Sequence, residues 1–252
     1  MNESMSNSVF KPCAIVPVFN HQQKIKTVLL RLHEFHLPCI VVDDGSSDEC
    51  AQVLNSVAQQ YDWVSLQRLA QNSGKGVAVC HGLACAEVQG YSHALQIDAD
   101  GQHDLNDVPT FLAQAAQNPL TVISGWRSYD AMPGPRRRGR KLTDFWVKIH
   151  TFSGLLKDSM CGYRLYPLGP TMKLVAAKKI GARMDFDTDI LVRLFWSGLD
   201  VKNIPTKILY QDDIPSHFHI FKDNLRITWM HTRLFFGMLL RIPRLLKRCL
   251  NA

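Results

Sequence analysis

The sequence lacks the patterns of a secreted, metal-stabilised or membrane-spanning chain. Its seven cysteines are odd in number and no two form a CxxC pair, which excludes a zinc ribbon and a disulfide framework. No run reaches the roughly 18 apolar residues that a transmembrane helix needs. The first 13 residues are polar and contain no apolar core of a signal peptide. We therefore expect reduced cysteines and a cytoplasmic location.

Acidic residues are fewer than basic ones, but the difference is local. The 252 residues include 29 Lys and Arg and 22 Asp and Glu, which gives a formal net charge of +7. Residues 134–148 carry a net +5 and residues 222–249 a net +6, so the rest of the chain is mildly acidic. This distribution favours two local anionic partners, and we expect no nucleic-acid ligand.

Short apolar runs alternate with helical stretches through the first 125 residues. The predicted strands are 14–18, 39–42, 64–68, 94–97 and 120–124, and the predicted helices lie near 22–36, 47–60, 76–89 and 106–117. Strands that alternate with helices of this length indicate an α/β fold with a mostly parallel, Rossmann-like sheet flanked by helices. Ligands of such sheets bind beyond the carboxyl ends of the strands.

The pattern after residue 126 is less regular. We predict a Pro/Gly/Arg loop over 127–141, helices near 142–156 and 187–196, a strand near 200–209 and a basic helical stretch over 222–249. The expected organisation is a flexible N-terminus (1–11), one α/β domain (12–221) and a C-terminal basic amphipathic segment (222–252).

Two carboxylates directly follow the strand predicted at 94–97. Asp98 and Asp100 are two residues apart, so in an extended chain they lie on one side, roughly 7 Å from each other. With the side-chain oxygen of Gln102 they suit Mg²⁺ or Mn²⁺, hard cations that usually keep substrate phosphates among their ligands. The alternative is a polar turn, in which Asp and Gly are common.

Acidic residues also follow the strand predicted at 39–42. A carboxylate of Asp43 or Asp44 suits the N–H groups of uracil or guanine, although the same segment suits a turn and a helix cap. Lys75 precedes a predicted helix, where it suits a phosphate or a base. The spacing of its glycines is not that of a Walker A loop, and an exposed loop lysine is the alternative.

In their joint order these motifs resemble glycosyltransferase family 2. The matching segments are 16–20 (VPVFN), 42–48 (VDDGSSD), 72–76 (NSGKG), 98–103 (DADGQH), 125–128 (GWRS), 158–166 (DSMCGYRLY) and 184–191 (MDFDTDIL). The chain is similar to dolichyl- and polyprenyl-phosphate sugar transferases. Near the C-terminus it is also similar to bacterial family-2 transferases that are often encoded with lipid- or polyene-synthesis enzymes. It implies a GT-A fold, sugar transfer from a UDP- or GDP-sugar, and Mg²⁺ or Mn²⁺ as cofactor.

The resemblance also implies roles for individual residues. The nucleotide would be bound by Pro17, Phe19, Asp43 or Asp44, Lys75 and Asp98. The diphosphate and its metal would lie at Asp98, Asp100 and Gln102, and donor or acceptor phosphates would face Arg127 and Arg164. His217, in a C-terminal loop, is a further candidate metal ligand.

Transfer to a hydroxyl acceptor needs a general base. Asp187 and Asp189 are the candidates, although acids in the first turn of a helix are also favoured by the helix dipole. A lipid-phosphate acceptor is already anionic and needs no base, and arginines such as Arg127 and those at 136–138 would then hold it. We expect a metal-dependent, inverting glycosyltransferase with a lipid-linked or membrane-presented acceptor.

The C-terminal stretch 222–249 mixes basic residues with Trp, Phe and Leu. This composition suits a helix that lies on an anionic membrane, kinked at Pro243, so we expect a peripheral location at the inner face of the cytoplasmic membrane. Packing on its own domain or on a second subunit of a homodimer is the alternative.

Two other functions compete with sugar transfer. A sugar-phosphate nucleotidyltransferase is disfavoured because its Gly/Arg/Lys-rich N-terminal loop is absent from the sequence. A non-catalytic, membrane-associated protein that binds nucleotide sugars is disfavoured because Asp98, Asp100 and Gln102 are all present.

Overall fold

The computed structural model describes residues 9–128, 134–208 and 220–250. Its strands are β1 (Pro12–Val18), β2 (Cys39–Asp43), β3 (Val64–Arg68), β4 (His93–Gln96), β5 (Thr121–Arg127), β6 (Arg164–Pro167) and β7 (Asp200–Thr206). Its α-helices are α1 (Ile25–His33), α2 (Asp48–Gln60), α3 (Lys75–Val88), α4 (Val108–Gln117), α5 (Gly134–Thr151), α6 (Leu168–Ala177), α7 (Phe186–Trp196), α8 (Ile220–Leu239) and α9 (Ile242–Leu250).

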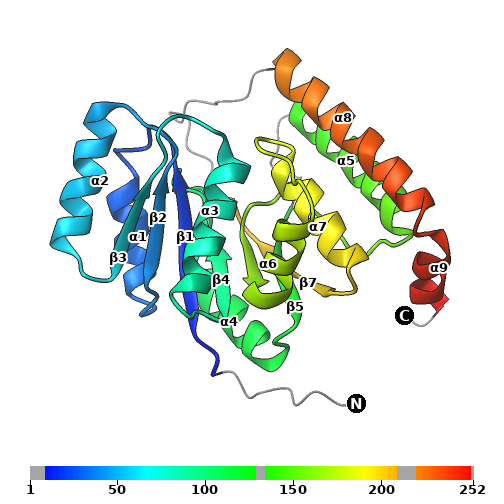
Figure 1. Ribbon diagram of the computed structural model, residues 1–252, viewed down its shortest axis with the longest axis horizontal. Coiled ribbons are helices and arrows are strands. Elements are labelled where there is room, and N and C mark those ends of the chain that lie inside the picture. Colours follow the sequence, from blue (N-terminus) through cyan, green and yellow to red (C-terminus); the bar gives the residue numbers. More distant parts are fainter. Residues whose placement is uncertain (1–8, 129–133, 209–219, 251–252) are drawn as a thin grey trace.

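The described strands form one seven-stranded sheet in the order β3-β2-β1-β4-β6-β5-β7. All neighbours in it are parallel except β6, which is antiparallel to both β4 and β5. The carboxyl ends of the parallel strands share the upper edge of the molecule in Figure 1. This edge is where ligands of a parallel sheet bind.

Helices cover both faces of the sheet (Figure 1). On β1, Ile15 belongs to a core cluster shared with α3, α5, α6, α7 and α8, whereas Ala14 and Val16 belong to a second cluster shared with α1, α2 and α4. Successive side chains of a strand point to opposite faces, so a run that is apolar throughout supplies both clusters. This explains why the predicted strands show no alternation of polar and apolar residues.

The predicted α/β class, the five N-terminal strands and the four helices between them are confirmed. The loop predicted over 127–141 is wrong in part, because α5 already begins at Gly134. Pro135 lies in the first turn of that helix, where a proline has no hydrogen bond to lose. Strand β6 was not predicted, because a four-residue run that begins with Arg164 gives little strand signal.

The basic C-terminal stretch forms two helices that meet just before Pro243. One face of α8 packs on the domain through Met230, Leu234 and Met238, which are buried, while Trp229 and other large apolar side chains stay exposed. Within the described ranges, every helix is too short or too polar to cross a membrane. All seven cysteines are unpaired, as predicted.

Candidate functional site

The loops that follow β1 and β2 are joined at the carboxyl edge of the sheet. The backbone N–H of Asn20 donates to Ser46 Oγ at 3.0 Å, and Asn20 Oδ1 accepts the N–H of Ser47 at 2.9 Å. Asn20 has a φ of 57°, a left-handed conformation that asparagine tolerates better than most residues. Pro17 and Phe19 are half-buried beside this junction. The structure therefore brings these two candidate nucleotide contacts next to the loop that follows Asp43 and Asp44.

Asp43 and Asp44 hold the neighbouring loops together. Asp43 accepts the N–H of Ser46 at 2.9 Å and pairs with Arg68 at 2.9 Å. Asp44 accepts the N–H groups of Ser73 and Gly74, at 2.7 and 2.8 Å. Burial raises the pKa of Asp44, although these two N–H groups oppose the shift. Both carboxylates thus shape the loop edge, and direct contact with a base stays a prediction.

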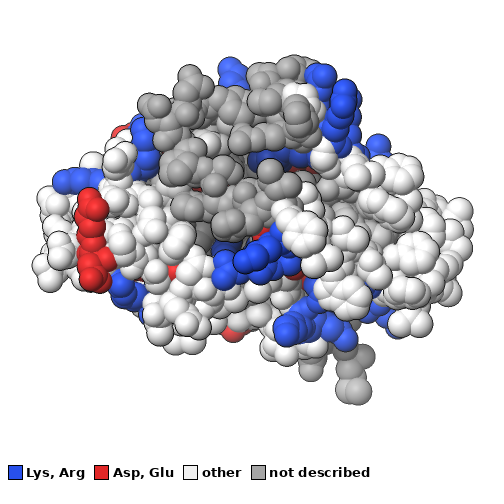
Figure 2. Space-filling model, turned by 90° about the horizontal axis from the view of Figure 1, so that it is seen from above, with Lys and Arg blue, Asp and Glu red and all other residues white. Residues whose placement is uncertain are grey.

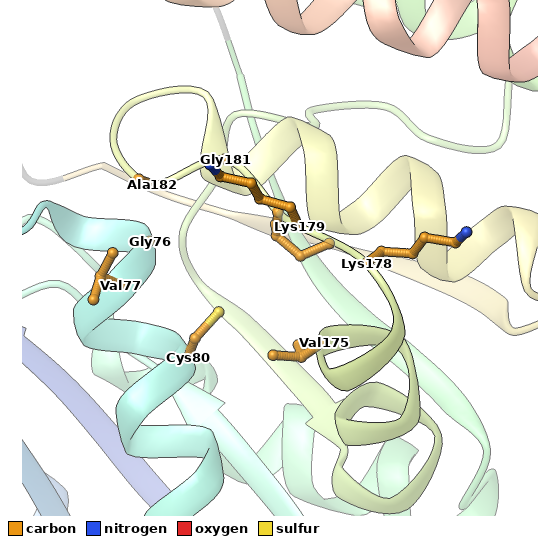
Figure 3. Close-up of a pocket in the computed structure, with 9 residues that line it drawn as sticks. Gly76, Val77, Cys80, Val175, Lys178, Lys179, Gly181 and Ala182 are labelled. Carbon is orange, nitrogen blue, oxygen red and sulfur yellow. The ribbon is translucent and has the colours of Figure 1, made fainter.

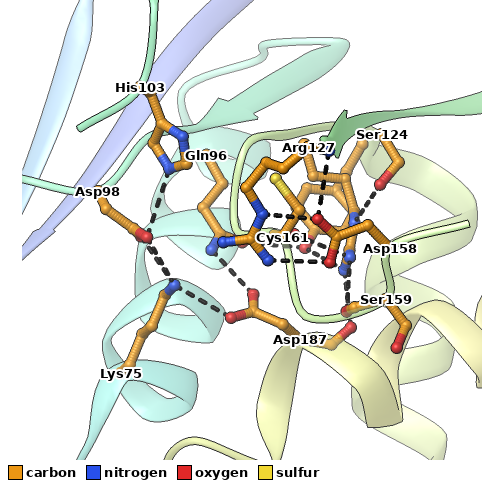
Figure 4. Close-up of polar contacts among 12 residues, drawn as sticks. Lys75, Gln96, Asp98, His103, Ser124, Arg127, Asp158, Ser159, Cys161 and Asp187 are labelled. Carbon is orange, nitrogen blue, oxygen red and sulfur yellow. Dashed lines mark hydrogen bonds and ion pairs between the residues drawn. The ribbon is translucent and has the colours of Figure 1, made fainter. Parts of the chain in front are cut away.

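Lys75, the first residue of α3, links two carboxylates at the centre of the site (Figure 4). Its Nζ lies 2.8 Å from Asp98 Oδ1 and 3.0 Å from Asp187 Oδ2. Asp187 Oδ1 accepts the amide of Gln96 at 3.1 Å, and Gln96 Oε1 accepts the hydroxyl of Tyr166 at 2.9 Å. Residues from α3, β4, β6 and α7 therefore converge on one polar cluster.

The cluster is electrostatically balanced. Burial alone would lower the pKa of Lys75, but the carboxylates of Asp187 and Asp98 raise it above its usual value. Burial would raise the pKa of Asp98, but Lys75 and His103 hold it well below its usual value. His103 Nε2 lies 3.4 Å from Asp98 Oδ2, a contact to which the sequence analysis gave no role. Lys75 and Asp98 are therefore both charged near neutral pH.

Gly162 leaves the space that this ion pair occupies. A Cβ at Gly162 would lie 2.5 Å from Lys75 Nζ and 3.0 Å from each carboxylate oxygen of Asp98. These separations are shorter than normal contacts of about 3.5 Å. Any larger residue at this position would displace the lysine.

The predicted metal ligands fit a cation that takes much of its coordination from a substrate. Asp98 Oδ1 is buried and has no hydrogen-bond donor among the described residues, since its ion pair with Lys75 is not aligned as a hydrogen bond. Asp100 Oδ1 accepts the backbone N–H of Gln102 at 2.9 Å, so a cation would use the other carboxylate oxygen, Oδ2. Mg²⁺ commonly uses one or two carboxylates together with substrate phosphates.

No group of three or more His, Cys, Asp or Glu side chains that could hold a metal occurs in the part of the chain that the structure describes. The candidate ligand His217 lies outside the described residues. A metal at Asp98 and Asp100 would therefore depend on oxygens from a bound diphosphate.

The two candidate bases, Asp187 and Asp189, point in different directions from α7. Asp187 faces Lys75, whereas the fully buried Asp189 carboxylate pairs with Arg193 at 2.5 Å and accepts the N–H of Gly181 at 2.9 Å. Residues two positions apart on a helix do not share a face. Burial raises the pKa of Asp189, while Arg193 opposes the shift. The geometry therefore favours Asp187 over Asp189 as a group that meets substrate.

Arg127, at the end of β5, forms a bidentate ion pair with the buried Asp158. The two contacts are 2.6 and 2.9 Å, and Arg140 of α5 lies 3.6 Å from the same carboxylate. This pair ties the end of β5 to the loop before β6 and to α5. The sequence analysis missed Asp158, although it begins the segment 158–166 that carried the resemblance.

Arg164 is completely buried beneath the site. Its guanidinium donates to the carbonyl oxygens of Asp187, Ser159 and Cys161, at 2.8, 3.1 and 3.0 Å. These contacts suit a residue that positions Asp187 and the loop at 159–163. They do not suit the direct phosphate contact that the resemblance implied for Arg164.

A cavity of about 230 Å³ lies behind the site, between α3 and the loop that joins α6 to α7 (Figure 3). The backbone N–H of Gly76 donates to Ala182 O at 2.9 Å, which fixes this loop against the start of α3. Cys80 lines the cavity, and burial raises its pKa to about 11. A protonated thiol gives this cavity no evident nucleophile, and we assign the cavity to loop packing.

Comparisons with known proteins agree with the resemblance. The family model described as "Glycosyl transferase family 2" matches residues 13–174. A dolichyl-phosphate beta-glucosyltransferase of Dictyostelium discoideum is 26% identical over 251 residues, covering 86% of this chain and 73% of the relative. The UDP-N-acetylglucosamine–dolichyl-phosphate N-acetylglucosaminyltransferase of Methanococcus voltae is 23% identical over 216 residues, covering 79% of this chain and 85% of the relative.

A solved structure shares the fold. It is glucosyl-3-phosphoglycerate synthase from Mycobacterium tuberculosis, in complex with Mn²⁺, UDP-glucose and phosphoglyceric acid. The similarity has a TM-score of 0.64 at 14% identity and covers 92% of this chain and 79% of the other. The predicted GT-A fold is thereby confirmed.

Proposed function

Since the chain belongs to glycosyl transferase family 2 and is a glycosyltransferase, we propose that it moves a sugar from a UDP- or GDP-sugar to a polyprenyl phosphate or a similar membrane-presented acceptor. The observation that carries this proposal is the convergence of Lys75, Asp98 and Asp187 at the carboxyl edge of the sheet. Relatives whose names specify dolichyl-phosphate acceptors support the acceptor class.

The donor would lie across the loops that follow β1, β2 and β4. Pro17 and Phe19 would contact the base, together with Asp43 or Asp44, and the diphosphate would extend toward Asp98. Two features support this assignment: Pro17 and Phe19 are half-buried apolar side chains, and the neighbouring carboxylates are held by backbone N–H groups. Apolar side chains would pack on the ring of the base, and a carboxylate would accept hydrogen bonds from its N–H groups.

The leaving diphosphate would be stabilised by Mg²⁺ or Mn²⁺ held at Asp98 and Asp100, with Gln102 adding an oxygen. A bound divalent cation supplies charge that offsets the negative charge of the leaving group. Lys75 provides a permanent cation at the same place, since its ammonium is anchored by Asp98 and Asp187. Preorganised charge of this kind stabilises a transition state without further reorganisation.

The acceptor would attack the sugar from the side opposite to the diphosphate, so a single displacement inverts the sugar carbon. A phosphate acceptor needs no general base, and the exposed Arg137 and Arg138 of α5 would draw it to the site. With a hydroxyl acceptor, Asp187 would be the base, because Asp189 is enclosed by its own ion pairs.

A membrane surface would lie along α8. Phe221, Leu225, Trp229 and Phe236 are exposed and follow a spacing of four or seven residues, which puts them on one stripe of the helix. The face in Figure 2 is mainly uncharged toward the end of the molecule where α8 and α9 lie, and Lys and Arg gather near its centre. Large exposed apolar patches commonly mark membrane or protein contacts.

A thermal-shift panel tests the proposed donor and metal. Full-length protein is heated with UDP, GDP, UDP-sugars and GDP-sugars, each with Mn²⁺ or with EDTA. We expect stabilisation by one nucleotide class that depends on Mn²⁺, because a ligand that binds only the folded state raises its melting temperature. If none of the nucleotides stabilises the protein, the proposed function is wrong.

A further inference from the structure

A second cavity, open toward solvent, lies beside the turn between α8 and α9, remote from the cluster at Lys75. It has a volume of about 460 Å³ and lies between α9 and the C-terminal end of α7. Leu245 of α9 is buried and anchors that helix to the domain. Asp187 lies at the opposite end of α7, a helix of 11 residues, and at 1.5 Å per residue the two ends are roughly 15 Å apart. The cavity is therefore distinct from the donor site.

The lining of this cavity has an excess of positive charge. Its basic side chains are Arg241, Arg244, Lys247 and Arg248, and its acidic side chain is Asp200. Arg248 pairs with Asp200 at 2.7 Å and donates to the carbonyl oxygens of Phe195, in the last turn of α7, and of Leu199, which follows α7. The other three cations form no ion pair with a carboxylate in the described ranges 9–128, 134–208 and 220–250.

These unpaired cations repel one another. Burial lowers the pKa of Arg241, and the charges of Arg193 and Arg244 lower it further. The Arg241 guanidinium stacks 4.8 Å from the Trp196 ring and donates to Gly237 O at 2.7 Å, so it is held in place beside the cavity. A bound anion would relieve the repulsion, and guanidinium groups are well suited to phosphate oxygens.

Exposed leucines border the charged lining. Leu240 precedes Arg241 and is 85% exposed, and Leu250 near the end of α9 is 86% exposed. Leu246 lies four residues before Leu250 and is also exposed, so the two share one face of α9. Cations next to exposed leucines favour a membrane lipid over a phosphate ion in water, because only the lipid also covers the apolar side chains.

We propose that the cavity between α7 and α9 binds the phosphate headgroup of an anionic membrane phospholipid, with the neighbouring leucines in the membrane interface. Helix α8 extends from α9 to the upper edge of the molecule (Figure 1), so a membrane contact along its exposed side chains would continue from the headgroup site. This inference rests on the proposed membrane location, but it does not depend on the identity of the donor or of the acceptor.

Vesicle sedimentation of the full-length protein tests the headgroup site. Binding is measured to vesicles of phosphatidylglycerol in phosphatidylcholine and to vesicles of phosphatidylcholine alone. The test variant is Arg244→Gln/Lys247→Gln, in which both altered side chains are exposed. The charge-matched control is Lys26→Gln/Lys173→Gln, on α1 and α6, where both lysines are exposed as well.

We expect the test variant to bind the anionic vesicles roughly thirtyfold more weakly, since each basic residue near an anionic surface contributes about 1 kcal/mol. The control variant should bind like wild type, and a swap that keeps both charges, Arg244→Lys/Lys247→Arg, should retain most of the binding. Equal losses in the test and control variants would show only a general charge effect and overturn the proposal.

Titration with inorganic phosphate distinguishes a lipid headgroup from a free phosphate ion as the ligand of this cavity. In titration calorimetry without vesicles, we expect millimolar phosphate to bind weakly, and we expect it not to displace the protein from anionic vesicles. Phosphate binding that needs Arg244 and Lys247, combined with no vesicle binding, would overturn the lipid assignment. Sugar transfer to an acceptor in detergent should be the same in wild type and test variant, so this proposal can fail independently of the proposed function.

Discussion

Gly162→Ala should strongly reduce the activity of the enzyme while leaving it folded. The new Cβ would lie 2.5 Å from Lys75 Nζ, whereas a normal contact is about 3.5 Å, so the ammonium must move by about 1 Å. The end of a lysine side chain moves easily, and Gly162 has no left-handed backbone that an alanine would strain. The substitution therefore acts on the site and only slightly on stability.

The magnitude follows from the sensitivity of catalysis to position. A misplacement of about 1 Å can lower a rate on the order of a hundredfold. We expect kcat/KM for the donor to fall by about that factor, with a change in melting temperature of about 4 °C or less for a perturbation near 1 kcal/mol.

The assay compares this variant with Gly154→Ala as its control. A Cβ at Gly154 meets nothing within 4 Å, so Gly154→Ala should keep wild-type activity and stability. Both variants are measured by steady-state kinetics and by thermal melting. Wild-type kcat/KM in Gly162→Ala would refute the claim that the ion pair of Lys75 and Asp98 is part of the working site.

Two further predictions separate site residues from structural ones. Asp189→Asn should lower the melting temperature by roughly 6–12 °C, because breaking a fully buried ion pair costs about 3 kcal/mol or more. Asp187→Asn should lower kcat/KM by tenfold or more with a smaller loss of melting temperature, because Lys75 keeps Asp98 as a second carboxylate. Kinetics and melts of both variants check this, and the reverse pattern would contradict it. The buried His150 contacts the half-buried His231 at 3.1 Å, and burial lowers the pKa of each to about 4. These values lie below the unfolded-state pKa near 6.5, so the unfolded chain binds more protons than the folded chain between pH 6.5 and 4. The free energy of unfolding should therefore fall as the pH falls through that window, by at most about 3 kcal/mol per histidine. Urea melts across this range should show the loss in wild type and a smaller loss in His150→Gln, and equal slopes would count against the assignment.

The sequence predicted the parts of the molecule in which local pattern and topology agree. Apolar runs predicted the strands β1 to β5. Acidic residues at strand ends predicted that the site lies at the edge of the sheet where Asp43, Asp44 and Asp98 are found. Order along the chain was sufficient there, because the carboxyl ends of parallel strands meet at one edge of a sheet.

The remaining features depend on contacts between distant residues. The bond between Arg127 and Asp158 and the burial of Arg164 arise because β6 inserts antiparallel between β4 and β5, which no local run of residues indicates. The difference between Asp187 and Asp189 could have been inferred from helical periodicity alone, since residues two apart on a helix face different ways. The excess of positive charge near Arg241 could not be predicted from the sequence. It arises because the turn between α8 and α9 places basic side chains beside the end of α7.

We propose that Asp98 and Asp100 support metal-dependent sugar transfer, and a direct transfer assay tests this role. Full-length protein is supplied with a labelled nucleotide sugar, polyprenyl phosphate in detergent, and Mg²⁺ or Mn²⁺, and the labelled lipid is counted. We expect transfer by wild type, none with EDTA, and none by Asp98→Ala or Asp100→Ala with either metal. Near-wild-type transfer by both variants, or full transfer in EDTA, would show that transfer does not depend on a metal at Asp98 and Asp100.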